Sequence, residues 1–224
     1  MQKGILFLIL IVIISGVSCN RPEKVEKESR VSLLPYYREA TFTPVWMKKG
    51  AEKDLQDFHQ IPAFRLQNQE GVWITEQKFK DKIYITDFFF TSCPGICPKM
   101  TNNMLVLQEA FENDPDVLLL SHSVTPENDS VPVLANYATI KGVKASKWDL
   151  VTGSRSEIYN LGRNFYFVEE DLGLEKAADD FLHTENFVLV DKNRHIRGIY
   201  NGLNATAIQQ LIADVKNLQN EISE

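Results

Sequence analysis

A strongly β-forming segment that ends directly at a pair of cysteines constrains this chain more than any other feature. Residues 82–90 (KIYITDFFF) are β-branched and aromatic, as expected for a strand that is buried on both faces. The segment leads into TSCPGICPKM, in which three residues separate Cys93 from Cys97. The pattern predicts that the chemistry of the protein lies at the carboxyl end of a central strand.

Strand-like and helix-like segments alternate along the rest of the chain. The expected elements are a helix over 99–111, a strand over 117–124, helices over 131–140 and 154–161, strands over 187–190 and 195–200 that form a hairpin, and a last helix capped by Asn204. Gly162 is expected to close the helix over 154–161. Met100 and Met104 fall on the apolar face of the first helix, so we interpret them as core residues rather than ligands. This order predicts an α/β fold of the thioredoxin-like kind, with a central mixed sheet flanked by helices.

The amino-terminal residues have the pattern of an export signal. Lys3 precedes the apolar run 5–14, which is shorter than the about 20 residues that a membrane-spanning helix needs. Small residues at 15–18 then precede Cys19, and this resembles a bacterial lipoprotein site, where the cysteine is acylated. An uncleaved anchor and a plain secretory signal are the alternatives. All three place the rest of the chain outside the cytoplasm.

We therefore divide the chain into a signal peptide (1–18), a lipid-anchored amino terminus with a tether and leading segment (19–55), and one thioredoxin-like domain (56–224). Residues 20–32 are charged and nearly without large apolar side chains, which is typical of a tether. The formal net charge is −6, and acids and bases are interspersed. Nucleic acid is therefore not expected as a partner, whereas proteins and small ions are.

The cysteine turn has the residues of a helix start. Pro94 and Gly95 favour a tight turn, and Pro98 is tolerated in the first turn of a helix. If the helix begins near residue 96, the backbone N–H groups and the helix dipole favour the thiolate form of Cys93 and Cys97. Such sulfurs are suited to disulfide exchange or to metal binding.

The three-residue separation is wider than the two residues of a thioredoxin redox motif, and it leaves room for an ion. Two thiolates suit Cu(I), zinc or an iron–sulfur cluster, but two cysteines are too few for a cluster or a cysteine-rich zinc site. A third ligand must come from elsewhere, and histidine is the expected type. The chain offers His59, His122, His183 and His195. A structural disulfide is the alternative, because acylation of Cys19 would leave the other two cysteines as the only pair in the chain.

Three sequence blocks together resemble the Sco/SenC family of copper proteins. They are FFFTSCPGICPKM, SVTPENDSVPVLANYA and HTENFVLVD, in this order. The resemblance implies a thioredoxin-like domain that binds one copper, as Cu(I) or Cu(II), through Cys93, Cys97 and His183. It also implies a role in assembling the dinuclear copper site of cytochrome c oxidase. The implied partner is the oxidase subunit that carries this site, or another exported copper or thiol protein.

Two residues depart from the family pattern. Thr125 stands where the family commonly has Asp, and Gly95 stands where an acidic residue is frequent between the cysteines. Less negative charge near the ion should weaken Cu(II) binding more than Cu(I) binding. Asp129 matches the second acid of the family segment and is a candidate outer-shell group.

Other functions use the same cysteines. In a thiol–disulfide reductase, Cys93 and Cys97 would form the redox disulfide, and Asp87 would take the place of the buried acid that relays a proton in thioredoxins. Alternatively, Asp87 is an acid that a neighbouring donor satisfies. A thiol peroxidase would need threonine where Phe90 stands. A signalling role, in which the metal state alters contact with a partner, is a further hypothesis.

Overall fold

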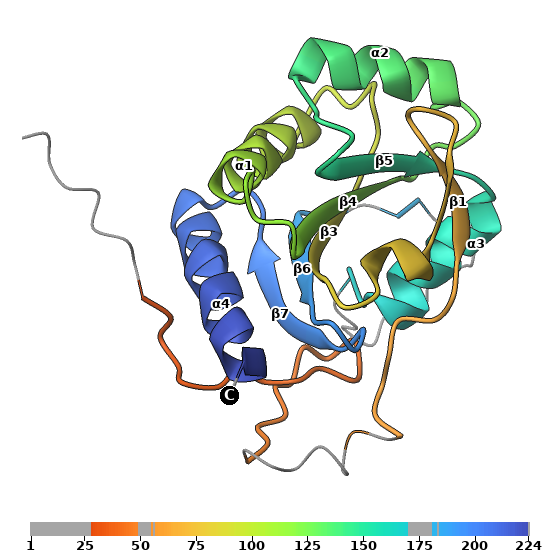
Figure 1. The fold of residues 1–224 in the computed structure, drawn as a ribbon. Helices are drawn as coiled ribbons and strands as arrows, with labels where there is room; N and C mark the ends of the chain where they lie inside the picture. The colour runs from red at the N-terminus through yellow and green to blue at the C-terminus, as the bar shows by residue number, and fades with distance from the viewer. Residues whose placement is uncertain (1–27, 49–54, 56, 170–180, 183, 224) are drawn as a thin grey trace, which may run out of the picture.

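A seven-stranded mixed sheet organises the chain (Figure 1). The computed structural model describes residues 28–48, 55, 57–169, 181, 182 and 184–223. The strand order across the sheet is β2-β1-β5-β4-β3-β6-β7. The strands are β1 (Arg65–Asn68), β2 (Trp73–Thr75), β3 (Ile83–Phe89), β4 (Val117–Ser123), β5 (Trp148–Thr152), β6 (Asn186–Val190) and β7 (Ile196–Asn201).

The three central strands set the place of the cysteines. Strand β3 is parallel to β4, and β4 is parallel to β5, so their carboxyl ends share one edge of the sheet. Strand β6 runs antiparallel to β3, so the segment that enters β6 reaches that same edge. The turn between β6 and β7 consequently lies at the opposite edge.

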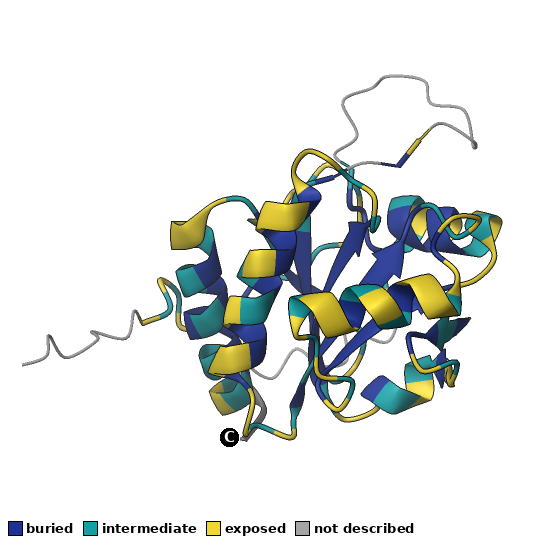
Figure 2. Cartoon of the chain, turned by 90° about the horizontal axis from the view of Figure 1, so that it is seen from above, coloured by how far each residue is buried: buried dark blue, intermediate teal, exposed yellow. Residues whose placement is uncertain are grey.

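Helices cover both faces of the sheet (Figures 1 and 2). They are α1 (Cys97–Ala110), α2 (Val131–Lys141), α3 (Arg155–Asn160), the π-helical turn η3 (Leu161–Phe165) and α4 (Ala205–Ser223), with a 3₁₀ turn η2 (Glu76–Phe79) before β3. Because side chains alternate along a strand, Ile85 of β3 packs in one core with α1 and α4. Phe88 packs in the other core with α3 and η3.

The strongly patterned elements lie where the sequence predicts them. Strands β3 and β4, the hairpin of β6 and β7, and helices α1, α2 and α4 are confirmed within one or two residues, whereas β1, β2 and β5 were not predicted. Met100 and Met104 are fully buried, as expected of core residues. Asn204 caps α4 by accepting a hydrogen bond from the backbone N–H of Thr206 at 2.9 Å.

The prediction that Gly162 closes a helix is wrong. Helix α3 passes at Leu161 directly into η3, which contains Gly162 and ends at Phe165. A side chain at position 162 would meet Leu182 at 2.7 Å and Phe88 at 3.0 Å. Glycine is therefore needed here for close packing and not as a helix stop.

The amino-terminal segment is fastened to the sheet by Arg197. The buried guanidinium group donates hydrogen bonds to the carbonyl groups of Leu34 (2.8 Å) and Pro35 (3.2 Å) and to the carboxylate of Glu221 in α4 (2.7 Å). Val31, at the end of the predicted tether, packs partly against the core. No helix within the described ranges is long and apolar enough to cross a membrane.

Candidate metal and thiol site

Both cysteines lie where β3 passes into α1. The chain turns through Pro94 and Gly95 and enters the helix at Cys97. Cys93 is partly exposed, Cys97 is buried, and both are free thiols. No side chain caps the first turn of α1, so its backbone N–H groups remain available to the sulfurs.

The surroundings act in opposite directions on the two thiols. Partial burial alone would raise the pKa of Cys93, but hydrogen bonds from the Cys97 thiol and from the backbone of residues 95–97 hold this pKa below its ordinary value. Burial, together with the hydrogen bond to Cys93, raises the pKa of Cys97 to about 12. Cys93 is therefore the better nucleophile, and Cys97 keeps its proton.

Asp87 lies on the same face of β3 as the core beneath Cys97. It is fully buried and accepts a hydrogen bond from Ser121, which in turn accepts one from the indole N–H of Trp148 at 2.8 Å. Burial raises the pKa of Asp87 to about 7 despite the hydrogen bond from Ser121. The negative charge of Asp87 also raises the pKa of Cys97, so the two groups are electrostatically linked. Both predicted roles of Asp87 are therefore compatible with the structure. Ser121 satisfies its carboxylate, and its pKa allows it to exchange a proton near neutral pH.

Asp129 joins the cysteine loop to the end of β4. Its carboxylate accepts hydrogen bonds from the backbone N–H and hydroxyl of Thr91 (3.2 and 2.5 Å), from Ser123 (2.6 Å) and from Thr125 (3.1 Å). It is 0% exposed. These contacts fix the residues that lead into Cys93, and the sequence did not reveal Thr91 and Ser123 as partners.

Three histidines are placed by the structure away from a metal-binding role. His122 is fully buried, stacks on Phe88 at 4.6 Å, and has its pKa lowered to about 3 by burial. His59 bonds the backbone carbonyl of Phe165 at 2.8 Å. His195 bonds the side chain of Gln60 and lies at the edge of the sheet opposite the cysteines. None of the three is grouped with Cys93 and Cys97 in an arrangement that could hold a metal ion.

The predicted ligand set cannot be assembled from the described residues alone. His183 and the predicted acylation site Cys19 both lie outside them. Among the described residues, no three His, Cys, Asp or Glu side chains are grouped so that they could hold a metal ion. The sulfurs of Cys93 and Cys97 do fit a soft ion that binds few ligands. The cysteine turn lowers the pKa of Cys93, which favours the thiolate form that binds such an ion.

An apolar pocket of about 320 Å³ opens beside the two sulfurs. Its walls include Phe88 at the end of β3, Ile96 in the cysteine turn and Leu182 before β6. Among its described lining residues none is charged, and the hydroxyl of Thr184 already donates to the carbonyl of Val168 at 2.6 Å. The sequence did not predict this pocket, because the contribution of Leu182 depends on the fold.

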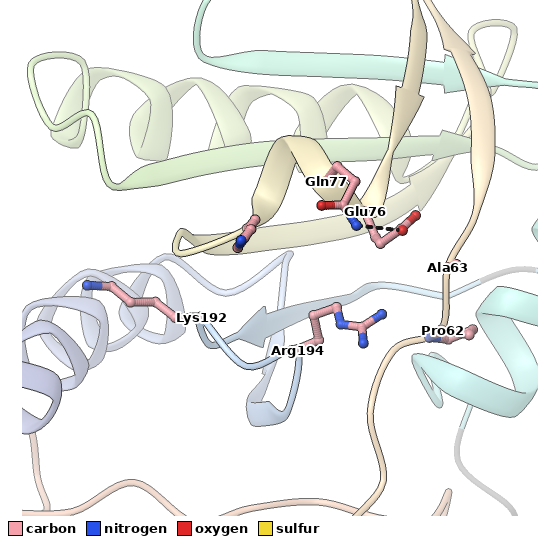
Figure 3. A pocket seen from close by; sticks show the side chains of 7 residues that line it. Pro62, Ala63, Glu76, Gln77, Lys192 and Arg194 are labelled. Atoms are coloured by element: carbon pink, nitrogen blue, oxygen red, sulfur yellow. Dashed lines mark hydrogen bonds between the residues drawn. The ribbon is translucent and has the colours of Figure 1, made fainter.

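A second cleft, of about 560 Å³, lies at the other edge of the sheet (Figure 3). It is lined by the segments before β1 and β3 and by Lys192 and Arg194 in the turn between β6 and β7. Its described lining holds neither cysteine nor histidine. The cleft is therefore not a candidate for thiol or soft-metal chemistry.

Comparison with known proteins identifies close similarity to one family. The model of the SCO1/SenC family matches residues 52–220. A SCO1/SenC family lipoprotein from Bacillus anthracis is 30% identical, with a TM-score of 0.63 over 72% of this chain and 95% of the relative. BsSco, a member of the Sco family of cytochrome c oxidase assembly proteins in which a disulfide switch was identified, is 32% identical, with a TM-score of 0.60 over 71% and 93%.

A copper-bound relative has the same fold. ScoI from Arabidopsis thaliana, solved with copper bound, is 26% identical, with a TM-score of 0.53 over 72% of this chain and 97% of that chain. The similarity confirms the predicted thioredoxin-like fold.

Proposed function

Because the chain belongs to the SCO1/SenC family, we propose that it is an exported copper chaperone that assists assembly of the dinuclear copper site of cytochrome c oxidase. Two relatives support the proposal: ScoI of Arabidopsis thaliana binds copper, and BsSco belongs to a family of oxidase assembly proteins. The proposed partner is the oxidase subunit that carries the copper site. Another exported copper or thiol protein is the alternative partner.

The pair of unlike thiols at the start of α1 is the observation that carries this proposal. Cys93 is partly exposed and ionises readily, so it can meet an incoming copper ion first. Cys97 must lose its proton to become the second ligand, and copper binding therefore releases a proton. A thiolate pair favours Cu(I), which suits an ion that must later be passed on.

His183 is proposed as the third ligand, and one copper is proposed per chain. The residue lies one position before Thr184, which lines the pocket beside the sulfurs. Asp129 supports the site indirectly, because its hydrogen bonds to Thr91 hold the loop that carries Cys93.

Thiol–disulfide exchange is the second candidate function, and the environment of Asp87 favours it. The Cys93 thiolate would attack a partner disulfide and form a mixed disulfide, while one partner sulfur leaves as a thiolate. Cys97 would then attack the Cys93 sulfur, so that the chain ends with a disulfide and the partner with two thiols. Asp87, with a pKa of about 7, could accept the Cys97 proton in that second step.

Comparison of His183→Ala with Asp87→Asn separates the two functions. If copper delivery is the function, we expect His183→Ala to lose at least about tenfold in restored oxidase activity, as losses at metal sites commonly do, while Asp87→Asn restores it. The measurement is oxidase activity in a strain that lacks the gene, at equal protein levels. His183→Ala should still exchange with a test disulfide, because imidazole is not needed for dithiol exchange.

The opposite ranking would contradict copper delivery and support the reductase. In that case His183→Ala would be nearly normal and Asp87→Asn would be the poorer variant. Full rescue by both variants would contradict both mechanisms and leave a structural or signalling role.

We also propose that the protein is held at the outer side of a membrane through a lipid on Cys19. The lipoprotein name of the similar Bacillus anthracis protein supports this proposal. Cys19→Ser is expected to move the protein from the membrane fraction to the soluble fraction, because an uncleaved apolar run of ten residues is too short to span the bilayer. Immunoblots of salt-washed fractions measure this, with Lys24→Ala as the control. Retention of Cys19→Ser in salt-washed membranes would show that the anchor is not the lipid.

A further inference from the structure

We infer that the apolar pocket beside Cys93 is the docking site for a partner segment in which a large apolar side chain lies next to a cysteine. The inference rests on the proposed function and adds to it the chemistry by which a partner is recognised. The pocket walls, the surface around the pocket and the position of the reactive sulfur each support it.

The walls favour an uncharged, apolar occupant. The pocket combines aromatic and aliphatic side chains from the end of β3, the cysteine turn and the segment before β6. Among the described lining residues, Thr184 has the only hydroxyl group, and this group is already hydrogen-bonded to Val168. A charged or strongly polar ligand would lose its hydration here without gaining new partners.

The rim extends the apolar surface into solvent. Ile96 is 39% exposed and Phe181 is 41% exposed, and they stand among the few large apolar side chains that the described residues leave open to water. The ring of Phe181 packs edge-on against Phe90 at 5.5 Å, which holds part of the rim in place. Apolar surface gathered around a reactive group is typical of an interaction site.

The sulfur of Cys93 determines what else the occupant carries. It lies in the pocket lining and is the more exposed of the two thiols. A group that receives copper from this site, or exchanges a disulfide with it, must reach Cys93, and a cysteine sulfur can do both. When the apolar neighbour of that cysteine fills the pocket, the partner sulfur is held beside Cys93.

A protein segment fits better than a small molecule. The volume of about 320 Å³ is near the lower end of the about 300–1,000 Å³ usual for small-molecule sites. The described lining also lacks the free polar groups that orient a small ligand. A segment needs to bury only one large side chain, since its backbone can stay in solvent beside Ile96 and Phe181.

Two peptides test the inference directly. One peptide contains Phe-Cys and the other contains Gly-Cys, and both have uncharged ends. In each peptide the cysteine is linked to glutathione as a mixed disulfide. The protein is the reduced full chain with Cys19→Ser, so that Cys93 and Cys97 are its only thiols. Cys93 attacks the peptide sulfur and glutathione leaves as a thiolate; Cys97 then releases the reduced peptide. We expect the Phe peptide to react at least about tenfold faster, the gain that burial of one large apolar side chain provides.

Substitutions of rim residues test whether the faster reaction of the Phe peptide depends on this pocket. Ile96→Ser and Phe181→Ser should each reduce the ratio of the two rates to below about threefold, because each removes part of the apolar surface. Ile140→Ser is the matched control: Ile140 is 71% exposed and lies at the end of α2, and its ratio should not change. The rate with oxidised glutathione should stay the same in Phe181→Ser and Ile140→Ser, whereas Ile96→Ser is judged by the ratio of the two peptide rates alone, because position 96 lies in the cysteine turn.

Binding of the same peptides with serine in place of cysteine, followed by NMR, separates docking from thiol chemistry. Preferred binding of the Phe peptide without any disulfide exchange would support docking and refute the reductase function. Normal exchange with oxidised glutathione but equal rates and equal binding for both peptides would overturn the docking site and leave the proposed function intact. Self-association that Phe181→Ser abolishes would also overturn it, by assigning the surface to a second copy of the chain.

Discussion

Cys93→Ser and Cys97→Ser are each expected to abolish tight Cu(I) binding. Each variant leaves one soft thiolate at the start of α1, and the hydroxyl that replaces the other is a poor ligand for Cu(I). Substitution of a residue that only hydrogen-bonds to a metal ligand costs about 10–100-fold in metal affinity. Loss of a ligand itself should therefore lower the Cu(I) affinity by more than about 100-fold. Anaerobic competition with a Cu(I) chelator measures the affinity of the reduced protein.

Cys19→Ser is the matched control for these two variants, since the predicted acylation site lies outside the proposed metal site. Its Cu(I) affinity should equal that of the unmodified chain. Because Cys97 is buried, its substitution could disturb packing, so the fold of Cys97→Ser is checked by near-ultraviolet circular dichroism. We expect the spectrum of the wild type. Wild-type affinity in either site variant would remove that cysteine from the ligand set.

Asp87→Asn is expected to stabilise the reduced, metal-free protein at pH 8 by about 2–4 kcal/mol. Burial raises the pKa of Asp87 from 3.8 to about 7, and each pKa unit corresponds to about 1.4 kcal/mol. The folded state therefore binds the proton of Asp87 more tightly than the unfolded state does, so the contribution of Asp87 to stability is fully present below pH 3.8 and is lost as the pH rises through about 7. Asparagine removes this loss and can still accept the hydrogen bond from Ser121, although its own N–H groups offset part of the gain.

Urea unfolding at several pH values measures this effect. The difference between Asp87→Asn and the wild type should be largest above pH 7 and should shrink as the pH falls towards 4. Glu109→Gln, a change of an exposed acid on α1, serves as the control and should show no such trend. A variant that is less stable than the wild type at pH 8 would show that the buried carboxylate is stabilised by contacts that asparagine cannot replace.

Local sequence patterns predicted the central elements but missed strands whose formation depends on their neighbours. Strand β3 is a continuous β-branched and aromatic run, and helix α4 has an apolar face with the helical period, so the sequence located both. Strands β1 and β2 have four and three residues, too few to show a periodic pattern. Strand β5 has five residues and includes the buried Asp149, which forms an ion pair with Lys78 in the folded protein. A buried acid interrupts the apolar pattern by which a strand is recognised in the sequence.

The site was predictable to the extent that its residues are close in sequence. Prolines and glycine around Cys93 and Cys97 predicted the turn and the helix start, and α1 begins at Cys97. The burial of Asp87 was expected, but its link through Ser121 to Trp148 joins three strands and is not visible in the sequence. The ligand role of His183 remains a prediction.

The central claim is that the two thiols and His183 bind copper, and anaerobic titration of the reduced full chain with Cu(I), and separately with Cu(II), tests it most directly. The account predicts that one copper per chain stays bound through gel filtration, and that bound Cu(II) shows a sulfur-to-copper charge-transfer band in the absorbance spectrum. The band should be absent from Cys93→Ser and Cys97→Ser. A wild-type protein that shows no band and retains no copper after gel filtration would contradict the account.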